Sequence, residues 1–316
     1  MKRWLSLAVV LTIGVGALVL SQRRKPEMDP SPNALVNLVA DAQREASRVP
    51  ARLTRLEDAE EIAIGEQMAT GYLANENPSG RSADDVLVQA YIARVGNRVL
   101  PYATRKLPYK FHYVADDRFY NAFALPGGHV FIGKGLISLM QNEDELASVL
   151  GHELEHADLY HCAERVQLEA RLRKLPVGEL GGLVALPVML FQAGYTKEQE
   201  FEADRQGMRL AVRTGYSPYG AIDLFRRMER QHRTTRTAPQ TPQEEILRGT
   251  WETLEGYFRS HPLTAERISQ IERLIEAEGW QNRSVKKPLD PAVASAVGAQ
   301  QYAGQQALPA KLKSSD

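Results

Sequence analysis

The sequence predicts an α+β fold that is predominantly helical and carries a small sheet. Apolar residues recur at helical spacing in three separate segments, which indicates amphipathic helices. Two short segments in the first half of the chain alternate as strands do. The chain has 316 residues, of which 43% are apolar and 25% charged, enough to bury a sizeable core.

The expected elements follow in chain order. Apolar residues at helical spacing mark a first helix that Pro101 ends: Leu87, Tyr91, Ile92, Val95 and Val99. Segments 109–114 and 130–132 are predicted strands, and Gly127 and Gly128 precede the second.

A helix is then predicted from Asn142, because Asn142 and Glu145 have the spacing of a capping box. Its apolar residues are Leu146, Val149, Leu150 and Leu154. A late amphipathic helix ends at Gly279 and carries Ile268, Ile271, Leu274 and Ile275.

The N-terminal segment 1–25 is predicted to be a membrane anchor or signal segment. An uncharged run from Trp4 to Leu20 lies between basic residues, and we expect it to be an uncleaved anchor. A removed signal peptide and a soluble helix are the alternatives. Basic residues on both sides leave the orientation open.

The rest of the chain divides into a tether, one domain and a tail. Prolines in 26–54 indicate a tether, 55–280 is the expected globular domain, and 281–316 is expected to be disordered. The apolar stretch 177–195 contains Glu179, two glycines and Pro187, which favours a buried or lid helix over a membrane span. Segment 230–249 is an expected exposed loop.

Charge and cysteine content exclude some functions. Lys plus Arg and Asp plus Glu are both 39, so no overall positive field favours nucleic acid. The single cysteine, Cys162, cannot form an intrachain disulfide.

An H-E-x-x-H pattern formed by His152, Glu153 and His156 carries the predicted chemistry. Two histidines four residues apart share one helix face, where both rings can reach a single zinc ion. Glu153 would then accept a proton from water activated by the ion and pass it to the leaving amine.

The third ligand has to come from elsewhere. The metzincin spacing fails, because Leu159 and Cys162 occupy the positions of its Gly and His. His161 is five residues from His156 and is expected to face away as a supporting or packing residue. Glu200 and Asp204, four apart on a second helix, are the better candidates: Glu200 as a ligand, and Asp204 as the partner of a ligating histidine.

Three motifs together resemble one known family over about 55–280. Gly151 to His156 read G-H-E-L-E-H with His161 beyond, Glu200 to Arg205 read E-F-E-A-D-R, and Ser260 to Pro262 read S-H-P. They are similar to the signatures of the zinc metallopeptidases that include the CAAX prenyl endoproteases, HtpX and the periplasmic BepA-type peptidases.

That resemblance implies a gluzincin-type domain, mostly helical, with a small sheet beside the zinc cleft. It implies one zinc ion held by His152, His156 and Glu200. Glu153 would be the general base and acid, and Asp204 would support a ligand.

His261 and Arg267 are further catalytic candidates. By itself, a His-Pro pair in a loop is more often structural. In BepA-like relatives the matching histidine can approach the zinc, so we expect His261 to be an autoinhibitory ligand or a donor to the tetrahedral oxyanion. Arg267 is a weaker candidate for the second role.

Segment 121–132 has two interpretations. Its glycines and alternating apolar residues suit either an exposed edge strand that pairs with an extended substrate, or a core strand after a glycine turn. His129 is expected at the surface or in the cleft, and not as a ligand.

The sequence also departs from this family. No helical-repeat domain is recognisable after Gly279. Cleavage of prenylated substrates needs a large intramembrane chamber, whereas this chain has one candidate span, so we do not expect that activity. We expect a zinc endopeptidase that cleaves unfolded or extended protein chains in envelope quality control, on the periplasmic side of a bacterial inner membrane. A metal-bound chaperone or adaptor that does not cleave, or a latent enzyme, is the alternative.

Overall fold

The structure is a computed structural model that describes residues 56–76, 81–174, 176, 179, 194–235, 261 and 265–299. The predicted N-terminal segment and tether, most of 177–195 and the end of the tail lie outside these residues. No helix in the described ranges is long and apolar enough to cross a membrane.

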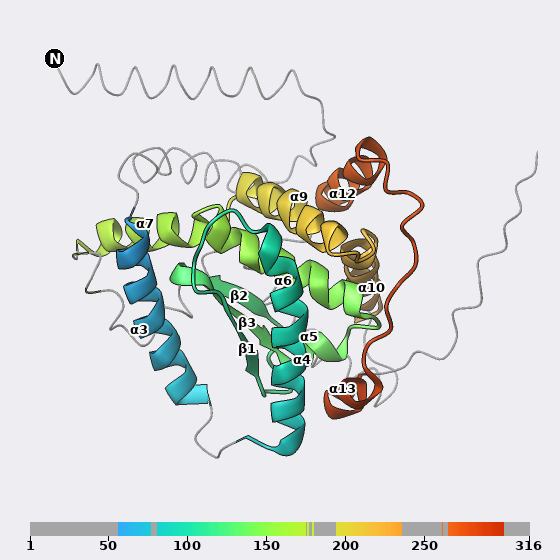
Figure 1. The fold of residues 1–316 in the computed structure, drawn as a ribbon, viewed down its shortest axis with the longest axis horizontal. Coiled ribbons are helices and arrows are strands. Elements are labelled where there is room, and N and C mark those ends of the chain that lie inside the picture. The colour runs from blue at the N-terminus through green and yellow to red at the C-terminus, as the bar shows by residue number, and fades with distance from the viewer. Residues whose placement is uncertain are drawn as a thin grey trace, which may run out of the picture. The chain divides into compact units, whose positions relative to one another are not determined.

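Helices make up most of the fold (Figure 1), and the prediction of a predominantly helical α+β domain is confirmed. In chain order the longer helices are α3 (Asp58–Glu76), α4 (Ala83–Val99), α6 (Glu143–Asp158), α7 (His161–Arg173), α9 (Lys197–Arg213), α10 (Gly220–Thr235) and α12 (Ala265–Ala277). The short helices are η1 (Leu100–Tyr102), η2 (Pro126–Gly128), α5 (Lys134–Ser138) and α13 (Pro291–Ala296).

The sheet has three strands in the order β1 (Lys110–Val114), β3 (His129–Gly133) and β2 (Ala122–Leu125). β1 pairs with β3 in parallel, with Lys110 opposite His129, and β2 pairs with β3 antiparallel, with Phe123 opposite Phe131. The two predicted strands are confirmed as β1 and β3, whereas β2 had not been separated from the glycine turn.

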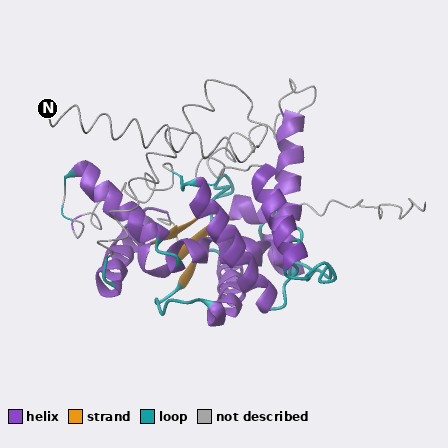
Figure 2. Cartoon of the chain, turned by 90° about the horizontal axis from the view of Figure 1, so that it is seen from above, coloured by secondary structure: helices purple, strands orange, loops and turns teal. Residues whose placement is uncertain are grey.

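The sheet is the middle layer of the domain, with helices around it (Figure 2). Val130 and Ile132 share one cluster with residues of α4 and α6, while Phe131 joins a second cluster with residues of α3 and α7. Successive residues of a strand point to opposite faces, so both faces of β3 are covered. Because β3 also lies between β1 and β2, it is a central core strand, and the core-strand interpretation of 121–132 holds for it, whereas β2 in the same segment lies at an edge of the sheet.

The side chain of Gln89 occupies the outer edge of β1. Its Nε2 donates to the carbonyl of Phe111 at 2.8 Å, and its Oε1 accepts from the backbone N–H of Tyr113 at 2.8 Å. An amide side chain that satisfies both groups takes the place of another strand at this edge.

A buried carboxylate holds the turn between β2 and β3. Glu61 accepts from the backbone N–H of Gly127 at 3.1 Å and pairs with Arg105 at 2.6 Å. Gly127 has a φ of 73°, a left-handed conformation that glycine adopts without strain. The backbone also lies so close to α3 that a Cβ on Gly65 would be 1.9 Å from the carbonyl oxygen of Pro126.

The start of α6 is tightly fixed. The Oδ1 of Asn142 accepts from the backbone N–H of Glu145 at 3.0 Å, which confirms the predicted start of this helix. The Glu145 carboxylate forms two bonds with Arg227, at 2.6 and 2.7 Å, and so ties α10 to this end.

Two expectations about irregular segments are contradicted over the part of each segment that the structure describes. Residues 281–299 are ordered: α13 packs on α4, with Val293 fully buried and Val297 4% exposed. Val293 and Val297 are four residues apart, so they share the face that packs on α4. Residues 230–235 are helical as the end of α10, and the rest of the expected loop lies outside the described residues.

Candidate metal centre

Helix α6 places the first two candidate ligands. His152 and His156 are one turn apart and both are buried. Their Nε2 atoms lie 3.1 Å from each other, so both rings face the same point, as the four-residue spacing predicts.

Helix α9 brings in the third candidate. Thr196 caps it: its Oγ1 accepts from the N–H of Gln199, whose Oε1 accepts from the N–H of Thr196. The helix then crosses α6 where Gly151 and Gly207 meet, and a Cβ on Gly207 would be 2.7 Å from the carbonyl carbon of Gly151. Two glycines let the backbones approach, and Glu200 thereby reaches the histidine pair.

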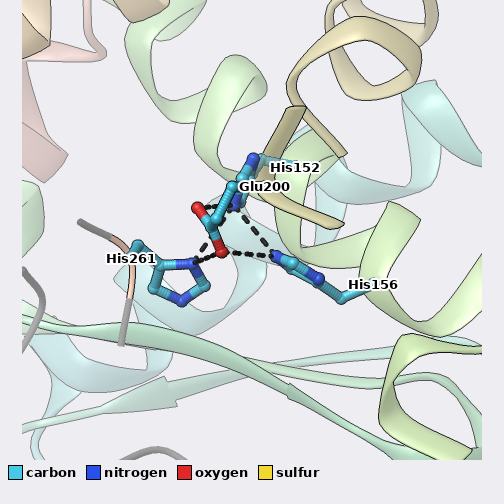
Figure 3. Close-up of side chains that lie close together, drawn as sticks. All are labelled: His152, His156, Glu200 and His261. Carbon is cyan, nitrogen blue, oxygen red and sulfur yellow. Dashed lines mark hydrogen bonds and ion pairs between the residues drawn. The ribbon is translucent and has the colours of Figure 1, made fainter. Parts of the chain in front are cut away.

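His152, His156, Glu200 and His261 form one buried cluster (Figure 3), in which one ligand atom from each lies within 4.8 Å of the others. The Nε2 of His152 is 3.3 Å from Nδ1 of His261 and 3.6 Å from Oε2 of Glu200. The Oε1 of Glu200 is 3.5 Å from Nε2 of His156 and 3.0 Å from Nδ1 of His261.

These separations fit a tetrahedral zinc site. Ligand atoms about 2.0–2.1 Å from one ion lie about 3.3 Å from each other. The four side chains supply imidazole and carboxylate atoms, which is the chemistry that zinc accepts in proteins. As the fourth member of the set, His261 would occupy the position that a catalytic site leaves to water.

Glu153 lies beside the cluster without joining it. The side chain is fully buried, its Oε1 is 3.4 Å from Nε2 of His261, and neither oxygen has a hydrogen-bond partner among the described residues. Burial raises the pKa of Glu153, and the neighbouring rings of His261 and His152 act in the opposite direction. An uncompensated buried carboxylate is costly, so this site fits a nearby cation.

The profile of peptidase family M48 matches residues 87–275, more than half of the chain. The chain belongs to peptidase family M48. The family resemblance expected from the three motifs is confirmed, and the protein is a metallopeptidase by membership.

Among its relatives are two bacterial proteins, both named beta-barrel assembly-enhancing protease. The Yersinia pestis protein is 32% identical and the Escherichia coli K12 protein 30% identical, each over 200 residues that cover 57% of this chain and 41% of the relative. The mitochondrial metalloendopeptidase OMA1 of Schizosaccharomyces pombe is 27% identical over 193 residues, 58% of this chain and 52% of the relative. The chain thus spans about two fifths of the bacterial relatives and half of the yeast one.

In this M48 domain, Asp204 and Arg267 stand behind the ligand atoms. The Oδ1 of Asp204 is 3.0 Å from Nδ1 of His152, within reach of the role expected from the sequence. The Arg267 guanidinium binds both oxygens of Asp204 at 2.6 and 2.7 Å and lies 2.9 Å from Oε2 of Glu200. The guanidinium of Arg267 is thus engaged by two carboxylates. These contacts favour a role in orienting Glu200 and Asp204 over the predicted role as a donor to the oxyanion.

Neighbouring side chains keep the carboxylates of Glu200 and Asp204 ionised. Burial by itself raises the pKa of Glu200, but His261 and Arg267 outweigh it and hold this pKa well below its usual value. The Asp204 pKa is lowered in the same way, with Arg267 outweighing burial. Both groups are therefore ionised at neutral pH, as a ligand and its partner need to be.

The prediction that His161 faces away from His156 is wrong. The metal helix ends at Asp158, and Tyr160 has a φ of 65°, so a new helix starts at His161 in another direction. The Nδ1 of His161 consequently lies 3.0 Å from Nδ1 of His156. Its expected role beside the ligands agrees with this position, although the helical-wheel argument behind the expected direction was wrong.

Sequence reasoning missed Tyr195 and misplaced His129. Tyr195 stacks on His156 with ring centroids 3.7 Å apart, and its hydroxyl is 3.5 Å from Sγ of Cys162. No local pattern signals this contact, which joins segments 39 residues apart in number. His129 is 1% exposed and lies 3.0 Å from the ring of His112, so it is a core residue.

Proposed function

We propose that this protein is a zinc-dependent endopeptidase that cleaves unfolded or extended protein chains, acting in protein quality control of the cell envelope. The observation that carries the zinc centre is the set of ligand separations near 3.3 Å, with a buried carboxylate beside it, Glu153, that has no hydrogen-bond partner among the described residues. Membership of the M48 family supports the reaction class.

The residues of the chain have distinct parts in the reaction. His152, His156 and Glu200 would hold zinc, which when bound polarises the scissile carbonyl and activates water. Glu153 takes a proton at its carboxylate and passes it to the leaving amine. Its burial excludes bulk water, which favours transfer of that proton to the substrate.

His261 closes the site in this arrangement. Its Nδ1 lies 3.3 Å from Nε2 of His152, where it would be the fourth ligand of a bound zinc ion. A neutral imidazole there excludes both water and a substrate carbonyl, so His261 has to withdraw before cleavage. We infer that this conformation is latent. Donation by His261 to the oxyanion after it moves is the alternative role.

The substrate class and cellular place rest on less direct support. Two relatives have names that refer to the assembly of β-barrels, and a third is named a mitochondrial metalloendopeptidase. The N-terminal segment 1–25 would attach the protein to the inner membrane or export it, on the periplasmic side. The closed fourth position also supports the rival, a metal-bound chaperone or adaptor that does not cleave.

The test combines metal analysis of the purified full chain with digestion of casein, an unfolded substrate, by the wild type and by Glu153→Gln. We expect one zinc per chain in both proteins, digestion by the wild type alone, and loss of digestion on chelation that added zinc restores. Equal digestion by both proteins assigns the activity to a contaminant. Zinc without digestion favours the rival or the latent form, and His261→Ala then separates these two.

A native disulfide-bonded protein compared with its reduced and alkylated form tests the preference for extended chains. Equal cleavage of both forms contradicts that preference, whereas cleavage of the unfolded form alone supports it.

A further inference from the structure

We propose that Glu202 and His161 form a two-residue relay that fixes the tautomer and orientation of the metal ligand His156. This inference rests on the proposed zinc centre and assigns positioning roles to two residues outside it. The Nδ1 atoms of His156 and His161 lie 3.0 Å apart, and Nε2 of His161 lies 3.2 Å from Oε2 of Glu202.

The backbone makes this contact possible. Tyr160, in the left-handed conformation, separates the metal helix α6 from α7, which begins at His161. His161 is therefore the first residue of a helix that points its ring back at the end of α6. The ring is fully buried, so water does not replace its contact with His156.

Donor and acceptor counting gives one consistent arrangement. A histidine that binds metal through Nε2 carries its proton on Nδ1, so Nδ1 of His156 donates. The Nδ1 of His161 then has to accept, which places the proton of His161 on Nε2. That N–H faces an oxygen of Glu202, and an ionised carboxylate is an acceptor that has no proton to donate. Each step leaves one choice for the next.

The two histidine ligands are thus held by different routes. Asp204 lies 3.0 Å from Nδ1 of His152, whereas the carboxylate behind His156 acts through a second imidazole. Glu202 has a side chain that is 37% exposed, while His161 is fully buried. The relay therefore connects a buried ligand to a carboxylate at the protein surface. Partners of this kind orient a ligand and raise its basicity.

Zinc affinity, measured by competition with a chelator on the full chain, tests the relay without relying on activity. We expect His161→Leu to weaken zinc binding about 10- to 100-fold, the usual effect of losing such a partner. Glu202→Ala is expected to weaken it about 10-fold. His161→Asn keeps an acceptor oxygen near the position of Nδ1 and is expected to retain most of the affinity.

The matched control is Glu198→Ala, which removes an exposed carboxylate from the same helix and is expected to leave affinity unchanged. The double variant His161→Leu with Glu202→Ala gives the decisive result. If the relay exists, Glu202→Ala has no further effect once His161 is lost. The melting temperature of each metal-free variant identifies a folding defect, in which case His161→Asn and Glu202→Ala carry the test.

The outcomes distinguish this inference from the proposed function. Full and additive effects of the two substitutions contradict the relay, as does wild-type affinity in both single variants. Failure of the wild type to bind zinc refutes the zinc centre itself.

Discussion

The contact between Gly151 and Gly207 controls the distance from Glu200 to the two histidines. A Cβ added to Gly207 would lie 2.7 Å from the carbonyl carbon of Gly151 and 2.7 Å from the backbone nitrogen of His152. These are backbone atoms, which do not rotate away as side chains do. Gly207→Ala therefore has to separate α9 from α6.

The size of the effect follows from the separation. Ordinary contact with a Cβ begins at 3.4 Å, so the helices have to part by about 0.7 Å at this point. Zinc sites tolerate ligand displacements of about 0.2 Å, and Glu200 lies two turns away on the moving helix. We expect an overpacking cost of about 1–3 kcal/mol in the free energy of unfolding. Zinc affinity is expected to fall about 10-fold or more.

The assay measures urea unfolding of the metal-free protein and zinc affinity by chelator competition. The control is Gly71→Ala, because a Cβ at this helical position meets no atom of the described residues within 4 Å beyond the backbone of its own helix. It is expected to leave zinc affinity unchanged and to stabilise the fold by about 0.5–1 kcal/mol, since alanine is the better helix former. Wild-type stability and affinity in Gly207→Ala would refute the reasoning.

Three further predictions concern the closed site, its buried charges and acid stability. His261→Ala is expected to raise the initial rate of casein cleavage about 10-fold, the effect of removing about 1.4 kcal/mol of self-inhibition; a fall supports the donor role, and no change excludes both roles. Arg267→Gln leaves the carboxylates of Glu200 and Asp204 without their shared cation and is expected to lower the free energy of unfolding, measured in urea, by about 3–5 kcal/mol. Arg267→Lys is not expected to restore it, because lysine cannot pair bidentately. Burial lowers the pKa of His112 to about 4, and the neighbouring His129 and Lys110 add to this effect. Between pH about 6.5 and 4 the ring is therefore neutral in the folded protein but protonated in the unfolded chain. Stability of the metal-free protein should therefore fall between pH 6.5 and 4, by at most about 3 kcal/mol from this group; urea unfolding at several pH values should show a weaker dependence in His112→Gln, and an unchanged slope would contradict the assignment.

Local patterns were sufficient for part of the site. The positions of His152, Glu153 and His156 follow from the geometry of one helix. The Asn142 cap follows from a contact between residues only three apart in the sequence. Nothing local relates two helices, so Glu200 was predicted to pair with this helix only because Glu200 and Asp204 have a second four-residue spacing.

Local reasoning failed where the chain changes direction or where distant segments meet. The helical-wheel argument misplaced His161, because it assumes one continuous helix. Tyr160 has a left-handed conformation, which ends α6 and lets α7 begin at His161 in another direction. Composition misjudged 281–299, where Val293 and Val297, four residues apart, are buried in the same cluster as residues of α4. The alternation of β3 did not distinguish an edge strand from a central one, since that difference depends on its neighbours.

The sequence by itself determined the helical character of the domain, the histidine pair with its adjacent carboxylate, and the chemistry available to them. These depend on residues within one or two helical turns, whose geometry is fixed by backbone hydrogen bonds. Only the tertiary structure decided that Glu200 and His261 lie within reach of the same two histidines, that Glu202 lies beside His161 and His161 beside His156, and that β3 is central. Each of these depends on how closely separate segments pack, and at the metal centre two glycines set that distance.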